Sequence, residues 1–364
     1  MRKRGKTLSL LLAFSLALGS FCPMPTSLTP LKMVQAAELE DPTEPTSGNC
    51  GKQGDNIKWS LEIDPDGMLY PDGGEQPDCY RLTLTGTGEL DESLFLNTDA
   101  QRPNTSPWYN YREVITSVSI SEGITSICGY GLADLCSLKS ITLPDSISSV
   151  GDFAFVGDSL LETVICGKGL KTIGEGAFAD LKSLSAIRLN EGLAEIGTSA
   201  FSRSALKEIS LPESLATIGN WAFSQLQLSY VRIPKNVEQI LYNPFLDTLL
   251  QEIQVDEDNQ HFFAENNILY EKRENGIPER AIAYARCNPA TSIIIRPETK
   301  TIGEFAFHDA ENLASVTLPP ALSDIGQEAF SGCQLEELYI PDSVKNIGNC
   351  AFLGCPPEKS GYPR

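Results

Sequence analysis

The stretch Leu335-Glu-Glu-Leu-Tyr-Ile-Pro341, continued by Ser343-Val-Lys-Asn-Ile-Gly348 and Ala351-Phe-Leu-Gly-Cys355, is one copy of a repeating unit. Its apolar pair Leu338/Ile340 has counterparts upstream, with steps between pairs of 23, 23, 23, 22, 22, 22, 40, 23 and 22 residues. The pairs are Val118/Ile120, Ile141/Leu143, Val164/Cys166, Ile187/Leu189, Ile209/Leu211, Val231/Ile233, Ile253/Val255, Ile293/Ile295, Val316/Leu318 and Leu338/Ile340. A period of about 20–50 residues indicates a solenoid.

Each unit has a direct physical interpretation. The two residues of a pair share one face of a short strand, and the residue between them faces solvent. A segment such as Ile147-Ser-Ser-Val-Gly151 follows, in which we expect glycine to permit a turn. Ala-Phe pairs then recur and predict a ladder of inward phenylalanines; they include Ala154-Phe155, Ala177-Phe178, Ala200-Phe201, Ala222-Phe223, Ala306-Phe307, Ala329-Phe330 and Ala351-Phe352. One coil cannot bury its own apolar face, so neighbouring coils must stabilise it.

These residues resemble the BspA-like family of bacterial leucine-rich-repeat surface proteins over about residues 113–355. The resemblance implies an α/β leucine-rich-repeat solenoid, right-handed, with short strands and an irregular or short helical convex side. The sequence departs from the family at the usual cysteine, which only Cys333 and Cys355 keep, while Asp158, Leu181 and Ser204 replace it. We expect the coils that lack it to hydrogen-bond less regularly.

The 40-residue step carries an insertion at about 256–292. Asn267-Ile-Leu-Tyr-Glu-Lys272, a turn around Asn275-Gly276 and Arg280-Ala-Ile-Ala-Tyr284 predict a hairpin that leaves the solenoid wall. Long coils also occur in the resembling family, so an ordinary family variant is the alternative interpretation.

The region before the repeats divides into three parts. Residues 1–36 have the pattern of a secretory signal peptide, a basic start followed by an apolar stretch of 14 residues at 8–21. A membrane-spanning helix needs about 20 apolar residues, so an anchor is the weaker interpretation, as is lipidation at Cys22, which follows the bulky Phe21. The composition of residues 37–49 predicts a flexible acidic linker. Residues 50–112 are predicted to form a small β-rich cap that contains a hairpin of 59–63 and 80–85. We expect Trp108 in this cap to cover the end coil of the solenoid. Residues 356–364 form a short polar tail.

The composition excludes several classes of partner. Without residues 1–36 the chain has 23 basic and 48 acidic residues, a net charge of about −25. Such a surface repels phosphate backbones and anionic membranes, although the charge also serves solubility outside the cell. Nine cysteines remain, at irregular spacing that matches neither a disulfide framework nor a CxxC metal site.

The chain lacks the common catalytic motifs. There is no GxSxG, HExxH or GxxxxGK[ST] motif, so we expect no enzyme activity, cofactor or metal. His261 and His308, the two histidines, are predicted to be surface residues. The acidic runs 64–67 and 256–259 weakly suggest calcium but lie where turns are expected.

The residues between the inward pairs predict a binding surface on the concave sheet. Ten strands about 4.8 Å apart give a sheet of roughly 45 Å, long enough for a protein or glycan. The candidate binding residues are Ile165, Arg188, Tyr230, Arg232, Gln254, Ile294 and Tyr339. Tyr and Arg are enriched at binding hot spots, and a solvated face without a ligand is the alternative.

The resemblance implies an exported binding protein, monomeric, secreted or on the cell surface, that adheres to an extracellular protein or glycan. A structural envelope-associated spacer and a secreted enzyme with an unrecognised site are the rival hypotheses. No nucleic acid partner and no membrane span after signal cleavage are expected.

Overall fold

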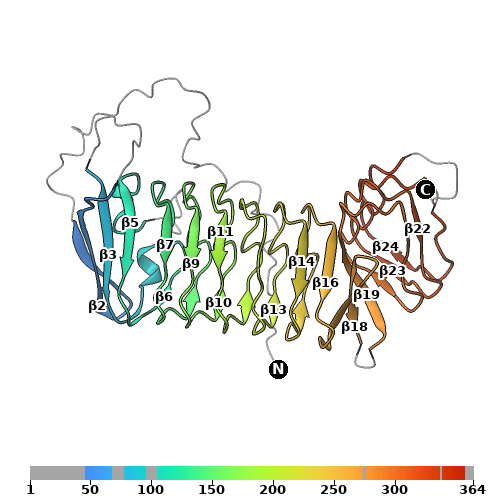
Figure 1. Cartoon of the computed structure of the whole chain (residues 1–364), viewed down its shortest axis with the longest axis horizontal. Helices are drawn as coiled ribbons and strands as arrows, with labels where there is room; N and C mark the ends of the chain where they lie inside the picture. Colours follow the sequence, from blue (N-terminus) through green and yellow to red (C-terminus); the bar gives the residue numbers. More distant parts are fainter. Residues whose placement is uncertain (1–45, 68–77, 96–104, 274–275, 337, 357–364) are drawn as a thin grey trace, which may run out of the picture. The chain divides into compact units, whose positions relative to one another are not determined.

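The computed structural model describes residues 46–67, 78–95, 105–273, 276–336 and 338–356. The expected signal peptide and all but the first residue of the expected tail lie outside the described residues. The described part is a β-solenoid with almost no helix (Figure 1). The expected α/β class is not confirmed: turns connect the strands, and the described helical segments are two single-turn 3-10 helices, Glu92–Leu94 and Tyr109–Tyr111.

Most turns of the solenoid contribute two short parallel strands instead of the single strand expected. Face 1 carries the predicted apolar pairs, in β7 (Ser140–Thr142), β9 (Thr163–Ile165), β11 (Ala186–Arg188), β14 (Tyr230–Ile233), β16 (Glu252–Val255), β20 (Ser292–Ile294) and β22 (Ser315–Thr317). Face 2 carries β4 (Gly88–Glu89), β6 (Ile124–Ile127), β8 (Ser149–Val150), β10 (Thr172–Ile173), β12 (Glu195–Ile196), β13 (Thr217–Ile218) and β15 (Gln239–Ile240), and later β21 (Thr301–Ile302), β23 (Asp324–Ile325) and β24 (Asn346–Ile347).

On face 1 the predicted alternation is confirmed. In β7 the side chain of Ile141 is buried, and its neighbours Ser140 and Thr142 are exposed. Strands β20 and β22 repeat this pattern. The pairing is in register from turn to turn, with Ile141 opposite Val164 and Val164 opposite Ile187. The apolar side chains of successive turns therefore stack on one another in the core, which comprises two clusters of buried residues along the solenoid.

Face 2 shows why a glycine follows most of its strands, including β8, β10, β12 and β13. A Cβ added at Gly197 would lie 2.7 Å from the carbonyl carbon of Gly174, and one at Gly219 would lie 2.5 Å from the carbonyl carbon of Gly197. None of these three glycines has a positive φ. The expectation that glycine serves a turn here was wrong, because these positions require glycine for the close approach of successive backbones.

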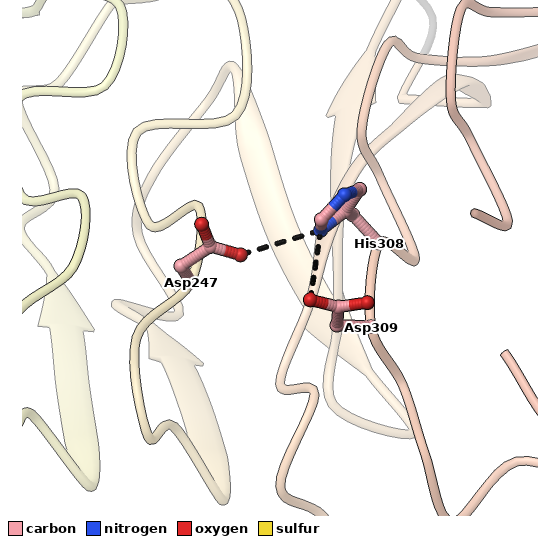
Figure 2. A group of neighbouring side chains, drawn as sticks. All are labelled: Asp247, His308 and Asp309. Carbon is pink, nitrogen blue, oxygen red and sulfur yellow. Dashed lines mark ion pairs between the residues drawn. The ribbon is translucent and has the colours of Figure 1, made fainter. Parts of the chain in front are cut away.

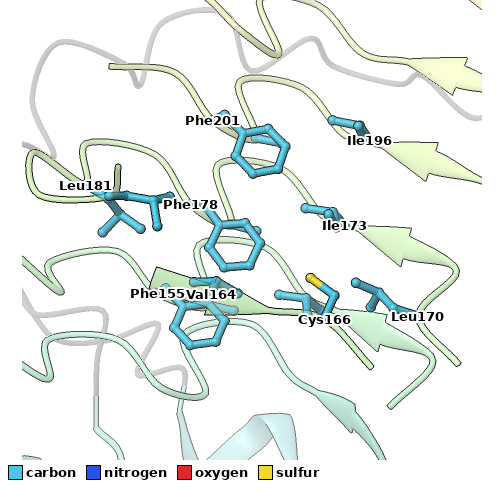
Figure 3. Packing of buried hydrophobic residues seen from close by; sticks show 14 of the residues in the cluster. Phe155, Val164, Cys166, Leu170, Ile173, Phe178, Leu181, Ile196 and Phe201 are labelled. Carbon is cyan, nitrogen blue, oxygen red and sulfur yellow. The ribbon is translucent and has the colours of Figure 1, made fainter. Parts of the chain in front are cut away.

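The Ala-Phe pairs form the predicted ladder of buried rings (Figure 3). From Phe155 through Phe178, Phe201 and Phe223 to Phe245, neighbouring ring centroids are 4.9, 5.5, 5.7 and 5.7 Å apart. The backbone adds a third line of hydrogen bonds between turns, since the N–H of each of Phe155, Phe178 and Phe201 donates to the alanine carbonyl of the next pair at 2.8–3.0 Å.

Left-handed residues flank the rings and make the turns there. Phe153, two residues before Phe155, has a φ of 55°, and Asp180, two residues after Phe178, has a φ of 62°. The same two positions recur with positive φ along the solenoid, for example at Ser199 and Arg203. Single left-handed residues reverse the chain and interrupt any helix, which accounts for the near absence of helix on this side.

The insertion forms a hairpin, but it does not leave the solenoid wall. Strands β17 (Phe262–Glu265), β18 (Ile268–Lys272) and β19 (Pro278–Tyr284) are antiparallel neighbours, and β19 then pairs in parallel with β21 of face 2. Tyr284 takes a ladder position, with its ring 5.4 Å from that of Phe307. Cys287 follows Tyr284 by three residues, as Cys333 follows Phe330, so it also occupies the family's cysteine position.

The N-terminal region is β-rich, as predicted. Strand β1 (Ser47–Gly51) pairs with β2 (Gly54–Ile63), β2 pairs with β3 (Tyr80–Gly86), and β3 pairs in parallel with β5 (Ile115–Ile120) of the first turn. Because β1 begins at Ser47, the last residues of the expected linker at 37–49 are strand instead. Trp108 is fully buried against Trp59 and Phe95. Its role in covering the solenoid end stays a prediction.

Candidate functional site

The predicted binding residues lie on face 1 with exposed side chains. Ile165 ends β9 and lies opposite Arg188 of β11. Arg232 of β14 lies opposite Gln254 of β16. The others are Tyr230 on β14, Ile294 on β20, and Tyr339, which is 76% exposed and lies outside the assigned strands. Face 1 thus presents these residues as separate groups along the solenoid.

The expected continuous sheet of ten strands is not formed. Strands β7, β9 and β11 form one sheet, β14 and β16 a second, and β20 and β22 a third. The turn between the first two sheets carries Ile209 and Ser210 but no assigned strand. Ile209 is only half-buried, as are Ile187 and Leu189 in the preceding turn. Arg188 and Arg232 consequently belong to different sheets, so the structure does not unite them in one patch on a single sheet.

The two predicted arginines differ in their partners. Arg232 contacts Glu213 at 2.8 Å and also pairs with Asp256. The hydrogen bond to Glu213 raises the pKa of the guanidinium. Arg188 has no side-chain hydrogen bond or ion pair within the described part of the chain. The positive charge of Arg232 is therefore balanced by two carboxylates of the same chain, whereas the positive charge of Arg188 is exposed to solvent.

The second sheet carries two neighbouring sets of polar side chains, Tyr230 with Gln254 and Glu252, and Arg232 with Asp256, which together we call the Tyr230 cluster. The Tyr230 hydroxyl donates to Oε1 of Gln254 at 2.9 Å, and the Gln254 amide donates to Glu252 at 2.6 Å. An open hollow of about 480 Å³ adjoins the cluster, lined by Arg232, Gln254, Asp256 and their neighbours. Its polar wall suits a hydrogen-bonding ligand better than an apolar one.

The two acidic runs serve the fold. Asp64 accepts hydrogen bonds from Arg81, Thr116 and Ser117 at 2.6–3.0 Å. The amide of Asn259, which is fully buried, donates to the carbonyl oxygens of Pro234 and Val237 at 2.8 and 3.1 Å. These side chains connect neighbouring parts of the fold. Both runs also contain turn residues, at 65–66 and 257–258, as predicted.

Sequence reasoning missed a second group, at the junction of the Phe245 and Phe307 turns. His308 was predicted to be a surface residue, but its side chain is 18% exposed and faces Asp247 and Asp309 (Figure 2). The Asp247 carboxylate, with smaller effects from Asp309 and Glu328, raises the pKa of His308, and His308 lowers the pKa of Asp247. The repeat offered a signal, because Asp247 and Asp309 both occupy the position two residues after a ladder phenylalanine.

The sequence matches the family model of the BspA type leucine-rich repeat region in six copies, over residues 106–203, 153–271 and 277–360. No curated protein matches it significantly. A solved leucine-rich repeat protein from Eubacterium ventriosum is 24% identical with a TM-score of 0.54, covering 84% of this chain and 70% of its own. The pneumococcal vaccine antigen PcpA is 24% identical with a TM-score of 0.58, covering 86% and 80%. Both are similar in fold.

Among the described residues, no helix reaches the length and hydropathy needed to cross a bilayer.

Proposed function

The chain belongs to the BspA type leucine-rich repeat family, and from this premise we propose that it is an exported, non-enzymatic protein that binds an extracellular protein or glycan. The proposal rests on face 1, where a uniform scaffold of buried aliphatic residues presents exposed residues that differ from turn to turn. Export is supported by the basic and apolar pattern of residues 1–36.

The Tyr230 cluster is the observation that carries the proposal. Its hydrogen bonds hold Tyr230 and Gln254 in one arrangement, and Glu213 and Asp256 hold Arg232. Side chains that are ordered before binding lose less conformational entropy when a ligand arrives. Tyrosine and arginine beside an open polar hollow thus supply a preorganised centre for contacts with a sugar or a polar peptide.

The Tyr230 cluster replaces the arginine pair of the sequence prediction as the main candidate. Arg232 supports the cluster from within, since its charge is met by two carboxylates of the same chain. Arg188, Ile165, Ile294 and Tyr339 are proposed as outer contacts for a partner that extends along face 1.

The experiment begins with capture of partners from extracellular matrix and on glycan arrays by the mature chain, residues 38–364. The variant Tyr230→Ala/Gln254→Ala is then compared with the control Thr317→Ala, which changes an exposed face 1 residue on β22. We expect the double variant to bind at least about tenfold more weakly, in keeping with hot-spot truncations, and the control to bind as the wild type does. A partner that binds all three equally would remove the cluster from the proposal.

A further inference from the structure

The group at the junction of the Phe245 and Phe307 turns brings together three potential metal ligands (Figure 2). Oδ1 of Asp247 lies 3.3 Å from Nδ1 of His308, and Oδ2 of Asp309 lies 3.5 Å from the same nitrogen. Within the described ranges, one ligand atom from each of these residues lies within 4.8 Å of the other two. Both carboxylate oxygens thus lie close to the same imidazole nitrogen.

The two distances at Nδ1 of His308 match the edges of a metal tetrahedron. Zinc binds nitrogen and oxygen ligands at about 2.0–2.2 Å, so two ligands of a tetrahedral ion lie roughly 3.3–3.6 Å apart. A direct N–H···O hydrogen bond is shorter, at about 2.7–3.2 Å. In agreement, Nδ1 of His308 and Oδ1 of Asp247 are both buried and make no hydrogen bond within the described structure.

A third carboxylate lies near the far side of the imidazole. Oε2 of Glu328 lies 3.6 Å from Nε2 of His308, which is longer than a hydrogen bond. Glu328 therefore adds negative charge beside the ring without bonding to it directly. Glu328 comes from the next turn, so the arrangement spans the Phe245, Phe307 and Phe330 turns.

Arg286 is the group that opposes a cation here. Its Nη1 lies 3.9 Å from Oδ1 of Asp247 and donates a hydrogen bond to Oδ2 of Asp309 at 3.4 Å, so it contacts the same two oxygens. Its Nε donates to the carbonyl of Thr248 at 2.8 Å. With a neutral imidazole, however, the three carboxylates and this one guanidinium leave a net charge of −2. A divalent cation would neutralise that charge, because Arg286 alone does not.

We propose that Asp247, His308 and Asp309 form a binding site for one divalent transition metal ion, of which Zn²⁺ suits the nitrogen and oxygen donors and the tetrahedral spacing. The site joins the two stretches of the aromatic ladder. Asp247 follows Phe245, which ends the first run of stacked rings, and His308 follows Phe307, which belongs to the run from Tyr284 to Phe352. Bound metal holds these two runs together at their junction.

The test is a calorimetric titration of the tag-free chain with ZnCl₂ after EDTA treatment, at about pH 8 because imidazole binds metal only when deprotonated. We expect saturation at one ion per chain and a higher melting temperature with Zn²⁺. His308→Gln should weaken binding at least about tenfold. The matched control is His261→Gln, which changes the only other histidine, exposed on the surface, and should bind as the wild type does.

A spectroscopic measurement on the unmutated chain makes the test independent of how the variants fold. Co²⁺ in the same site should give the intense visible bands of a tetrahedral ion, and Zn²⁺ should displace it. Absence of saturable Zn²⁺ binding, only the weak spectrum of hexahydrated Co²⁺, or equal loss in folded His308→Gln and His261→Gln would each overturn the proposal. The group would then be an ion-pair network of His308, Arg286 and the carboxylates.

Discussion

Asp158 departs from the repeat, and the departure changes the hydrogen bonding of its turn. It lies three residues after Phe155, where the later turns have Cys333 and Cys355, whose thiols donate to the carbonyl oxygens of Phe307 and Phe330 at 3.0 and 3.1 Å. Asp158 instead accepts a hydrogen bond from the Leu135 N–H at 2.8 Å, and its Oδ2 is buried with no partner in the described structure. The less regular bonding expected for this coil is therefore present.

The first prediction follows from the protonation of Asp158. Burial raises the pKa of this carboxyl well above its ordinary value of 3.8. A raised carboxyl pKa means that the stability it contributes is fully present below the unfolded pKa and is lost as the pH rises toward the folded pKa. Asp158→Asn removes the ionisable group, so the free energy of unfolding of the variant minus that of the wild type should increase from pH 5 to pH 8. Urea denaturation at both pH values measures this difference, and an equal difference at both would contradict the prediction.

At the scale of the structural element, successive turns within each stretch of sheet are bonded to one another along three lines. Face 1 and face 2 provide two parallel ladders, and the backbone of the Ala-Phe segment provides the third. Four of the phenylalanine rings, from Phe155 to Phe223, are fully buried between these lines. Because each turn contacts only its neighbours, loss of a ring in the middle weakens two interfaces, and loss of a ring at an end weakens one.

The second prediction tests this difference between central and terminal rings. Phe201→Ala removes a ring that stacks on Phe178 and Phe223, and should lower the free energy of unfolding by about 3–5 kcal/mol. Phe352→Ala, in the last described turn where the ring is only partly buried, should cost less. Chemical denaturation of both variants provides the measurement. Equal effects of the two substitutions, or an unchanged midpoint for Phe201→Ala, would show that the ladder does not carry the core.

At the scale of the whole molecule, the charge and the N-terminal pattern lead to a prediction about export. Residues 37–364 carry a net charge of about −25, and we expect such a charge to disfavour phosphate-rich partners. The Tyr230 cluster is also rich in acidic groups, since two carboxylates contact its one arginine. The third prediction concerns export: protein recovered from the culture medium should begin near Ala37 or Glu38, as determined by N-terminal sequencing. An intact Met1 on a protein retained inside the cell would contradict it.

The repeat made most of the fold predictable from sequence. Most of the inward pairs, the phenylalanine ladder and the hairpin of residues 59–63 and 80–85 were correct, because local sequence patterns determine each of them. The β-rich N-terminal region was predictable for the same reason. Local patterns also located the exposed candidates Ile165, Arg188, Tyr230, Arg232, Gln254, Ile294 and Tyr339 on one face.

The remaining features depend on contacts between turns, which no local pattern contains. The sequence predicted a turn at Gly197, but the close approach of its backbone to that of Gly174 is what requires glycine there. The sequence also predicted that the hairpin leaves the solenoid wall, but β19 pairs with β21 within that wall. The pairing of Arg232 with Glu213 and Asp256, and the meeting of Asp247 with His308, join residues 19 to 61 positions apart. The sequence by itself determined the solenoid, because a short repeat dictates how each turn buries its apolar face. Only the tertiary structure decided which polar groups meet on its surface, because that depends on the stacking of turns.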